Sequence, residues 1–367
     1  MKNLQDYLEN LYTCARTQCG FCVYECPVRK VLGFETYSSR GRMHVARALA
    51  QGLLEPCKEI AELYYKCTLC GYCEAVCALE NTSIFRAVRK LLVSENVAPK
   101  EHLAARDSIL TVDNPYSKDR KVKYSKTLPV KKSKTILYLG CTIPISRRQI
   151  VDALKYLLEK ACPEVGYLGK EEYCCGLILY ESGFEKEFIE QAEKNIESFK
   201  KNGVEKIITV CPGCYIALKE HYAEYFNIDY EVYHITEYFY ELVNSGKLKL
   251  LKLGGEVVYH DPCHLTRHGK VVEEPRALLE WLGIEVKEAP VYNKYYARCC
   301  GGSILMFYPE LASEIGVMRL NELLSTGLDT IVSACEICEI ALDKAAVKKG
   351  EFIEVLDVVE LLAKALK

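Results

Sequence analysis

Cysteine is the residue type in this sequence with the greatest capacity for chemistry, since the 367-residue chain contains 20 of them. Thiolates bind iron and zinc tightly, and a pair of thiols can also exchange two electrons by forming a disulfide. Cys57 and Cys162 stand apart from the others, and we expect them to be small buried apolar side chains. The other 18 fall into four groups, which predicts metal binding or redox chemistry.

The first two groups lie near the beginning of the chain, and each contains four cysteines that end in C-x2-C-x3-C. This spacing is close to that of bacterial two-cluster ferredoxins, in which three cysteines bind one 4Fe-4S cube and the fourth binds the other. It predicts one cube at Cys14, Cys19, Cys22 and Cys77, and a second at Cys67, Cys70, Cys73 and Cys26. The sequence departs from the pattern in the four-residue gap after Cys14 and in Ala78, where proline is usual.

The other two groups are copies of one five-cysteine motif. Copy one comprises Cys141, Cys174, Cys175, Cys211 and Cys214, and copy two comprises Cys263, Cys299, Cys300, Cys335 and Cys338. Matching cysteines are 122 to 125 residues apart, which indicates a tandem repeat. Five thiols exceed the four that tetrahedral zinc takes, and an adjacent pair cannot form an unstrained disulfide with itself. We therefore expect a multi-iron cluster in each copy.

The elements that must position these cysteines repeat as well. KTILYLGC and EVVYHDPC are expected strands that end at the lone cysteine, and KIITVCPGC and DTIVSACEIC are expected strands that end at the C-x2-C pair. EKEFIEQAEKNIESFKKNG and ELASEIGVMRLNELLSTG have the periodicity of helices. Residues 135–250 and 251–367 are thus predicted as two α/β repeats with parallel sheets.

Glycines and helix ends near the cysteines have two interpretations. Cysteines at the start of a helix feel its positive end, which favours thiolate. Gly176, Gly213, Gly301 and Gly302 could let the backbone approach an inorganic core, or could simply form turns. Both interpretations stay open.

The rest of the chain completes an α+β multidomain prediction. Residues 1–113 are expected to form a mostly helical, ferredoxin-like domain, because MHVARALAQGLL and SIFRAVRKLLVSEN have helical periodicity. Residues 114–134 are basic and lack periodicity, which predicts a linker.

Several functions are disfavoured by composition. A net charge of -2 provides no field for nucleic acid. The N-terminus lacks a signal-peptide pattern and no apolar run is long enough to span a membrane, so we expect a cytoplasmic protein that reaches a membrane only through a partner. Without a GxGxxG or P-loop motif, the chain is expected to bind no flavin or nucleotide itself. Structural zinc at the two N-terminal groups of four cysteines, here called the first and second quartets, is the less favoured alternative.

The order of motifs resembles a known family. Two ferredoxin motifs followed by two CCG repeats, with the segments GFETYSSRGRMHVARAL, DNPYS, YHDPCHL and CCGG, are similar to the D subunit of heterodisulfide reductase. Its relatives include the iron-sulfur subunits of glycolate oxidase, anaerobic glycerol-3-phosphate dehydrogenase and D-lactate dehydrogenase. The resemblance implies two cubane 4Fe-4S clusters and, in each five-cysteine set, a noncubane 4Fe-4S cluster.

Two activities are compatible with this resemblance. In heterodisulfide reductases the paired noncubane clusters cleave a mixed disulfide of two thiol coenzymes, and two intact five-cysteine sets favour this activity here. The alternative is the electron-transfer subunit of an FAD-linked 2-hydroxy-acid or glycerol-3-phosphate dehydrogenase, which passes electrons to quinone or another carrier. The expected partner is a flavoprotein or a membrane cytochrome b, and the expected acceptor is a small-molecule disulfide or quinone.

Basic side chains close to the motifs have two possible roles. They are Arg147, Arg148, His264, Arg267 and His268. Arginine forks could bind an anionic substrate. The favoured interpretation is that these groups offset cluster charge or face solvent.

Overall fold

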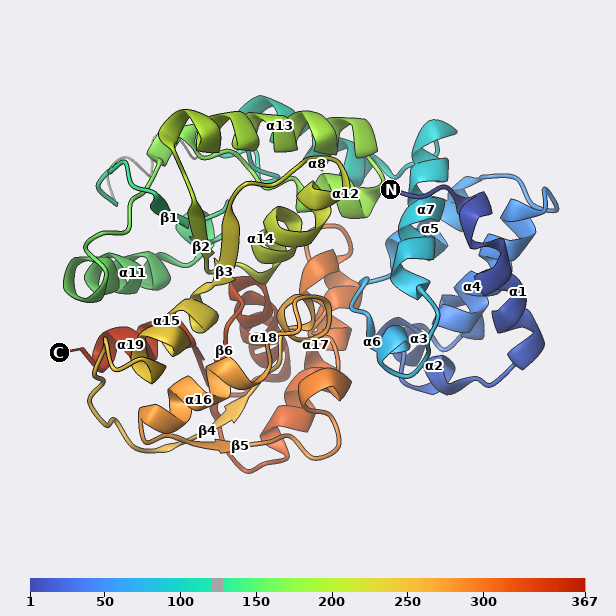
Figure 1. Cartoon of the computed structure of the whole chain (residues 1–367). Coiled ribbons are helices and arrows are strands. Elements are labelled where there is room, and N and C mark those ends of the chain that lie inside the picture. Colours follow the sequence, from blue (N-terminus) through green and yellow to red (C-terminus); the bar gives the residue numbers. More distant parts are fainter. Residues whose placement is uncertain (120–127, 367) are drawn as a thin grey trace.

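The computed structural model describes residues 1–119 and 128–366. A helical N-terminal region packs beside two α/β repeats, as predicted (Figure 1). The helical region lies at the right of the view, with the first repeat in green above the second in orange and red. No helix in these residues combines the length and the apolar character required to cross a membrane.

The helical region is built from short helices around its own core. Its elements are η1 (Leu4–Tyr7), α1 (Leu8–Thr17), α2 (Phe21–Tyr24), α3 (Pro27–Leu32), η2 (Glu35–Tyr37), α4 (Ser39–Ala50), α5 (Lys58–Tyr65), α6 (Tyr72–Ala75), α7 (Asn81–Ser94) and α8 (Lys100–Val112). Met43, Tyr64 and Phe85 are buried at the centre. Gly20 and Gly71 directly precede α2 and α6 and have positive φ angles of 77° and 71°, so both cysteine groups lead into a short helix through the same kind of turn.

The first repeat surrounds a three-stranded parallel sheet of order β1-β2-β3. Its elements are β1 (Thr135–Tyr138), α10 (Ile143–Ser146), α11 (Arg148–Ala161), η3 (Gly169–Glu171), α12 (Leu177–Ser182), α13 (Glu185–Asn202), β2 (Lys206–Thr209), α14 (Pro212–Ile216), η4 (Ala217–His221), η5 (Tyr222–Glu224), β3 (Glu231–His234) and α15 (Ile235–Asn244). The isoleucines of β1 and β2 are buried in the core, which fits a sheet covered by helices.

The second repeat has the same order of strands with one addition, β5-β4-β6-β7, all parallel. Its elements are β4 (Glu256–Tyr259), η6 (His264–His268), α16 (Glu273–Trp281), β5 (Glu285–Lys287), η7 (Lys294–Tyr296), η8 (Gly302–Ile304), α17 (Pro309–Leu324), β6 (Thr330–Ser333), α18 (Glu336–Lys349), β7 (Glu354–Asp357) and α19 (Val358–Lys364). At the place of β5, the described residues of the first repeat form an isolated parallel bridge between Ile136 and Gly166.

The two repeats exchange their last helices. Helix α15 of the first repeat packs on α16 of the second, and α19 of the second packs on α11 of the first. One buried core therefore contains residues of both repeats, among them Ile136 and Leu154 of the first and Leu278 and Leu362 of the second. The repeats form a single structural unit.

The described ends of the predicted linker contact the first repeat. The Tyr116 hydroxyl lies 2.9 Å from Thr142 Oγ1, and the Asn114 side chain is buried. On the other side, Lys131 exchanges two backbone hydrogen bonds with Tyr167. Residues 120–127 of the predicted linker lie outside the described residues.

We predict that Leu362→Ala destabilises the first repeat as well as the second. Leu362 is fully buried in the shared core, and truncation of a buried leucine costs about 2–5 kcal/mol of unfolding free energy. Hydrogen exchange of the α11 backbone amides measures the effect, with exposed Lys364→Ala as the control on the same helix. Unchanged protection of α11 would show that the two repeats are independent.

Candidate functional site

The parallel sheets explain how cysteines far apart in sequence meet. Cys141 and Cys211 follow β1 and β2, and Cys263 and Cys335 follow β4 and β6. Because neighbouring parallel strands end at the same edge of a sheet, each lone cysteine is brought beside its C-x2-C pair. The adjacent cysteine pair of each repeat comes from the loop that precedes α12 or η8.

The first repeat brings all five of its cysteines together. Cys174 interacts with Cys141 and Cys175, and Cys214 interacts with Cys175 and Cys211. The pKa of Cys175 falls to about 6, because hydrogen bonds from Cys174 and then Cys214 stabilise its thiolate against the effect of burial. The set therefore contains a thiol that deprotonates readily, as metal binding requires.

The second repeat reproduces this arrangement. Cys299 interacts with Cys263 and Cys300, and Cys338 interacts with Cys300 and Cys335. The pKa of Cys300 is well below its ordinary value, first because of its hydrogen bond with Cys299 and then because of Cys338. All five members are buried.

The two N-terminal quartets are interleaved as the spacing predicts. Cys14 lies near Cys22, Cys77 and Cys19. Cys26 lies near Cys67 and Cys70 instead of the quartet that precedes it in sequence. In the second quartet, Cys73 also neighbours Cys70 and Cys67. The structure thus places the predicted ligands of each cube side by side, including Cys14, and iron ligation itself stays a prediction.

The four cysteine groups follow one another in space. One cavity is lined by Cys22, a predicted ligand of the first cube, and by predicted ligands of the second cube, among them Cys26 and Cys70. Cys70 of the second quartet interacts directly with Cys299, and that contact lowers the pKa of Cys70 to about 6. Cysteine spacing did not indicate this contact, because it depends on how the helical region packs against the second repeat.

The two five-cysteine sets are also neighbours. The pKa of Cys211 is about 12: its hydrogen bond with Cys214 lowers it, whereas burial and the negative charges of Glu336 and Cys335 raise it. Glu336 and Cys335 belong to the second repeat, so they approach the first set from across the interface. The order in space is first quartet, second quartet, second five-cysteine set, first five-cysteine set.

Side chains of the second repeat hold the Thr68–Leu69–Cys70 loop of the second quartet. Arg267 Nε donates to the Cys70 carbonyl over 2.6 Å, and His268 Nε2 lies 2.9 Å from the Leu69 carbonyl oxygen. Ser303 Oγ donates to the Thr68 carbonyl over 2.8 Å. These contacts fix the position of Cys70 against the second five-cysteine set.

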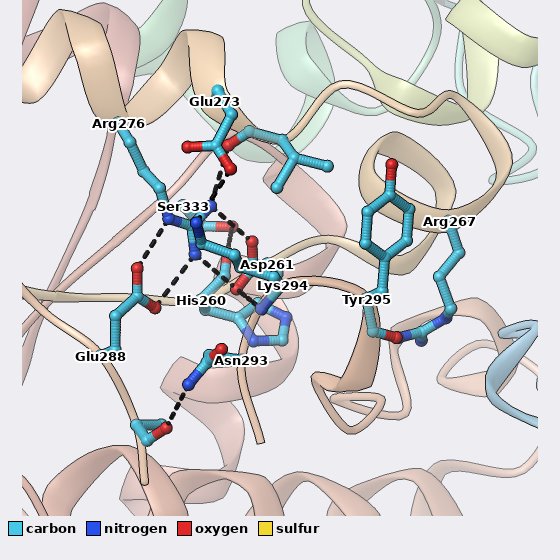
Figure 2. Close-up of polar contacts among 12 residues, drawn as sticks. His260, Asp261, Arg267, Glu273, Arg276, Glu288, Asn293, Lys294, Tyr295 and Ser333 are labelled. Atoms are coloured by element: carbon cyan, nitrogen blue, oxygen red, sulfur yellow. Dashed lines mark hydrogen bonds and ion pairs between the residues drawn. The ribbon is translucent and has the colours of Figure 1, made fainter. Parts of the chain in front are cut away.

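Asp261 fixes the turn that leads into Cys263. Arg276 donates two hydrogen bonds to Asp261, 2.8 and 3.0 Å long, and also pairs with Glu288 (Figure 2). The backbone nitrogen of Lys294 donates to the same carboxylate over 2.8 Å. This network could not be predicted from the motifs, although Asp261 belongs to the YHDPCHL segment.

The basic residues near the motifs are mostly engaged with protein groups. Arg147 pairs with Asp343 and lies 3.6 Å from Glu339. His264 bridges Glu181 and Cys263, and although burial lowers its pKa, these two acidic groups raise it well above the ordinary value. Arg148 is exposed. These contacts favour a structural and electrostatic role for Arg147, His264, Arg267 and His268.

The surroundings of the cysteines fit an anionic inorganic group. Arg42 is buried and Arg267 is partly buried, and the buried Nη2 atom of each lacks a hydrogen-bond partner within residues 1–119 and 128–366. Burial lowers the pKa of both guanidiniums, but the negative thiolates beside them raise it, with Cys67 contributing most for Arg42 and Cys70 for Arg267. Such cations beside groups of four and five cysteines suit iron-sulfur clusters with thiolate ligands.

Two further features fit such clusters: glycines that lie close to cysteine sulfurs, and cysteines that form no disulfides in the described residues. A Cβ atom at Gly140 would lie 2.9 Å from Cys214 Sγ, and one at Gly302 would lie 3.4 Å from Cys300 Sγ. Gly302 was among the glycines expected to approach a cluster, whereas Gly140, which precedes the lone cysteine of the first repeat, was not. All 20 cysteines lie in the described residues, and none forms a disulfide.

Comparison with known proteins also points to iron-sulfur binding. Residues 135–219 and 257–343 match a cysteine-rich domain family, and residues 11–81 match a 4Fe-4S dicluster domain family. The chain is 30% identical over 390 residues to the D subunit of the dihydromethanophenazine:CoB--CoM heterodisulfide reductase of Methanosarcina barkeri, covering 98% of this chain and 95% of that protein.

Two further relatives cover less of their own length. An EtfAB:quinone oxidoreductase of Syntrophomonas wolfei is 39% identical over 63% of this chain and 34% of its own. A probable iron-sulfur-binding oxidoreductase of Bacillus subtilis is 30% identical over 83% of this chain and 47% of its own.

We predict that Cys175→Ser and Cys300→Ser each remove the spectroscopic signal of one five-cysteine set and leave the N-terminal quartets reducible. The helical region has a separate core, so its metal sites should assemble without the mutated set. Electron paramagnetic resonance and iron content measure the outcome, with Cys57→Ser as the control outside every group. Simultaneous loss of all signals would contradict the separation.

We also predict that Arg267→Met weakens the contact between the helical region and the second repeat. The change removes hydrogen bonds to the carbonyls of Cys70, Tyr295 and Ala297, and bonds from a charged donor are each worth about 1.5–3 kcal/mol. The expected result is lower thermal stability and slower reduction of the five-cysteine sets. Exposed Arg148→Met is the control, and equal effects of the two changes would refute a specific role for Arg267.

Proposed function

The chain belongs to the family of iron-sulfur proteins that contains the D subunit of heterodisulfide reductase, and we propose that it conducts electrons from its helical region to the two five-cysteine sets, where a small-molecule disulfide is reduced. An oxidoreductase-type role as an iron-sulfur electron-transfer subunit follows from the family. The disulfide substrate is the part that we propose.

The ligands proposed for this function divide between two kinds of cluster. One cubane 4Fe-4S cluster would be held by Cys14, Cys19, Cys22 and Cys77, and the other by Cys67, Cys70, Cys73 and Cys26. Noncubane 4Fe-4S clusters would be held by Cys141, Cys174, Cys175, Cys211 and Cys214, and by Cys263, Cys299, Cys300, Cys335 and Cys338. When bound, such clusters supply one-electron carriers whose potentials depend on their surroundings.

The observation that carries the proposal is the contact of Cys70 with Cys299. Through it, a candidate ligand of the second cube touches a candidate ligand of the second five-cysteine set. Arg267 and His268 hold that contact in place through the Leu69 and Cys70 carbonyls. A continuous series of sulfur groups supports electron movement from the helical region into both repeats.

The exposed position of Cys19 supports the proposal that electrons enter the chain at the first quartet. Cys19 is exposed, whereas the other 17 candidate ligands, all in described residues, are buried or partly buried. Phe21 and Tyr24, which follow Cys19 on α2, are also exposed and are 68% and 66% accessible to solvent. We propose that the redox partner, a flavoprotein or a membrane cytochrome b, binds at this end.

The chemistry at the other end needs two electrons and two protons. Reduction of a disulfide R–S–S–R′ breaks the S–S bond and yields R–SH and R′–SH. Two intact five-cysteine sets beside one another support this reaction, because one sulfur could be held at each set. Arg147 and His264 keep the surroundings of the first and second sets ordered through their contacts with Glu339 and Glu181.

One relative favours a second candidate function. The similarity to an EtfAB:quinone oxidoreductase supports an electron conduit between a flavoprotein and quinone, with no disulfide chemistry in this chain. An FAD-linked 2-hydroxy-acid or glycerol-3-phosphate dehydrogenase partner belongs to this same class.

We predict that the anaerobically purified chain contains roughly sixteen irons with matching acid-labile sulfide, as four 4Fe-4S clusters require. The chemically reduced protein should then reduce a mixed disulfide of two anionic thiols, and the released thiols are the measured product. Protein that holds its iron yet transfers electrons only to a quinone analogue would refute disulfide reduction and favour the second candidate.

A further inference from the structure

We propose that His260 donates a hydrogen bond from Nε2 to a cysteine sulfur of the second five-cysteine set, and that this bond makes the cluster held there easier to reduce than the one held by the first set. The inference rests on the proposed function, because it requires that both sets bind iron-sulfur clusters.

His260 is placed rigidly beside that set. It directly follows β4 and is 1% exposed. Its backbone nitrogen donates to the Val332 carbonyl over 2.9 Å, and Ser333 Oγ donates to its carbonyl over 3.1 Å (Figure 2). A ring nitrogen of His260 and the sulfur atoms of Cys300 and Cys338 all lie within 4.8 Å of one another.

Arg319 determines which ring nitrogen carries the proton. Arg319 Nε donates to His260 Nδ1 over 3.1 Å, and this arginine is fully buried. A guanidinium has donors only, so Nδ1 must present its lone pair. A neutral imidazole then carries its proton on Nε2, and a second proton on Nδ1 would face the arginine charge.

The Arg319 side chain is itself held in place. Its Nη1 atom donates to the Tyr292 carbonyl over 2.8 Å and pairs with Glu322 over 3.0 Å. His260 Nε2 is buried and has no oxygen or nitrogen partner within the described part of the chain, and interaction with the His260 side chain is among the causes that lower the pKa of the Cys300 thiol. A donor with no oxygen or nitrogen acceptor, close to two sulfur atoms, indicates an N–H···S interaction.

The same geometry argues against His260 as an iron ligand. A metal-bound imidazole presents an unprotonated nitrogen to the metal and usually donates its other N–H to a carboxylate or carbonyl. Here Nδ1 accepts from the Arg319 guanidinium, which leaves the proton of the neutral ring on Nε2. His260 is therefore a hydrogen-bond donor that tunes the site.

The first repeat has no imidazole at the corresponding place. The 122-residue offset between Cys141 and Cys263 puts Tyr138 opposite His260. The Tyr138 hydroxyl donates to the Tyr173 carbonyl, so its proton is used within the protein backbone. Because hydrogen bonds to cluster sulfurs stabilise the more negative, reduced state, the second set should have the higher potential.

The test measures the reduction potential of the second set in the full chain, with Cys175→Ser present to remove the signal of the first. His260→Leu removes the donor, and we expect the ratio of reduced to oxidised cluster at a fixed potential to fall about tenfold, which equals about 59 mV for one electron. His260→Gln retains both an acceptor for Arg319 and an N–H donor, and it should restore most of the potential.

The matched control is Tyr138→Phe in the same background, which should leave the potential of the second set unchanged. An unchanged potential in His260→Leu, with the cluster assembled, would overturn the inference. Wild-type protein without iron at the five-cysteine sets would instead refute the proposed function.

A second measurement decides the question if His260→Leu does not assemble its cluster. Pulsed electron paramagnetic resonance of ¹⁵N-histidine protein should show a weak nitrogen coupling that disappears in His260→Gln, while any coupling from His264 remains. A strong coupling typical of iron-bound nitrogen, or no difference between the two proteins, would overturn the donor role.

Discussion

The gathering of many thiols in a protein interior is the constraint on which this structure depends. Buried thiolates repel one another and lose hydration, so each group needs compensating charge and donors close by. Buried Arg42 supplies positive charge beside Cys67 and Cys26, and partly buried Arg267 supplies it beside Cys70 and Cys263. The thiols themselves share protons, which is why Cys175 has a low pKa while Cys214 has a high one. Iron and sulfide would replace those shared protons.

In two parts of the structure, a pair of similar units each contributes a residue or a helix to the other unit. In the helical region, Cys26 and Cys77 each complete the other quartet. In the α/β unit, α15 and α19 each complete the core of the other repeat. Each unit therefore depends on the other, because one of its cysteines or one of its packing helices comes from the partner unit. The spacing between cysteine groups is consequently set by the rigid packing of the whole fold.

Much of this architecture could be predicted from local patterns. The strands that precede Cys141, Cys211, Cys263 and Cys335 could be predicted from apolar runs followed by cysteine, and the parallel sheets follow from the alternation with helices. The contact of Cys70 with Cys299 could not be predicted, since no periodicity encodes how a helical domain sits on a distant loop. The same holds for Arg267, whose partners are backbone carbonyls about 30 and 197 residues away in sequence. Backbone carbonyls carry no residue identity that a sequence pattern could reveal.

Differences between the repeats matter more for electron flow than their similarity. The turn before Cys263 contains His260 and Asp261, whereas Tyr138 and Leu139 precede Cys141 at the corresponding positions. Asp261 binds the Arg276 guanidinium and the Lys294 backbone, whereas in the first repeat the buried Glu172 carboxylate accepts from the backbone nitrogens of Leu139 and Gly140, and the Leu139 side chain belongs to the apolar core. The second set also lies against the helical region through Cys299, and the first set lies beyond it. Two sets with the same five cysteines thus occupy different surroundings, which would give the clusters proposed for them different potentials.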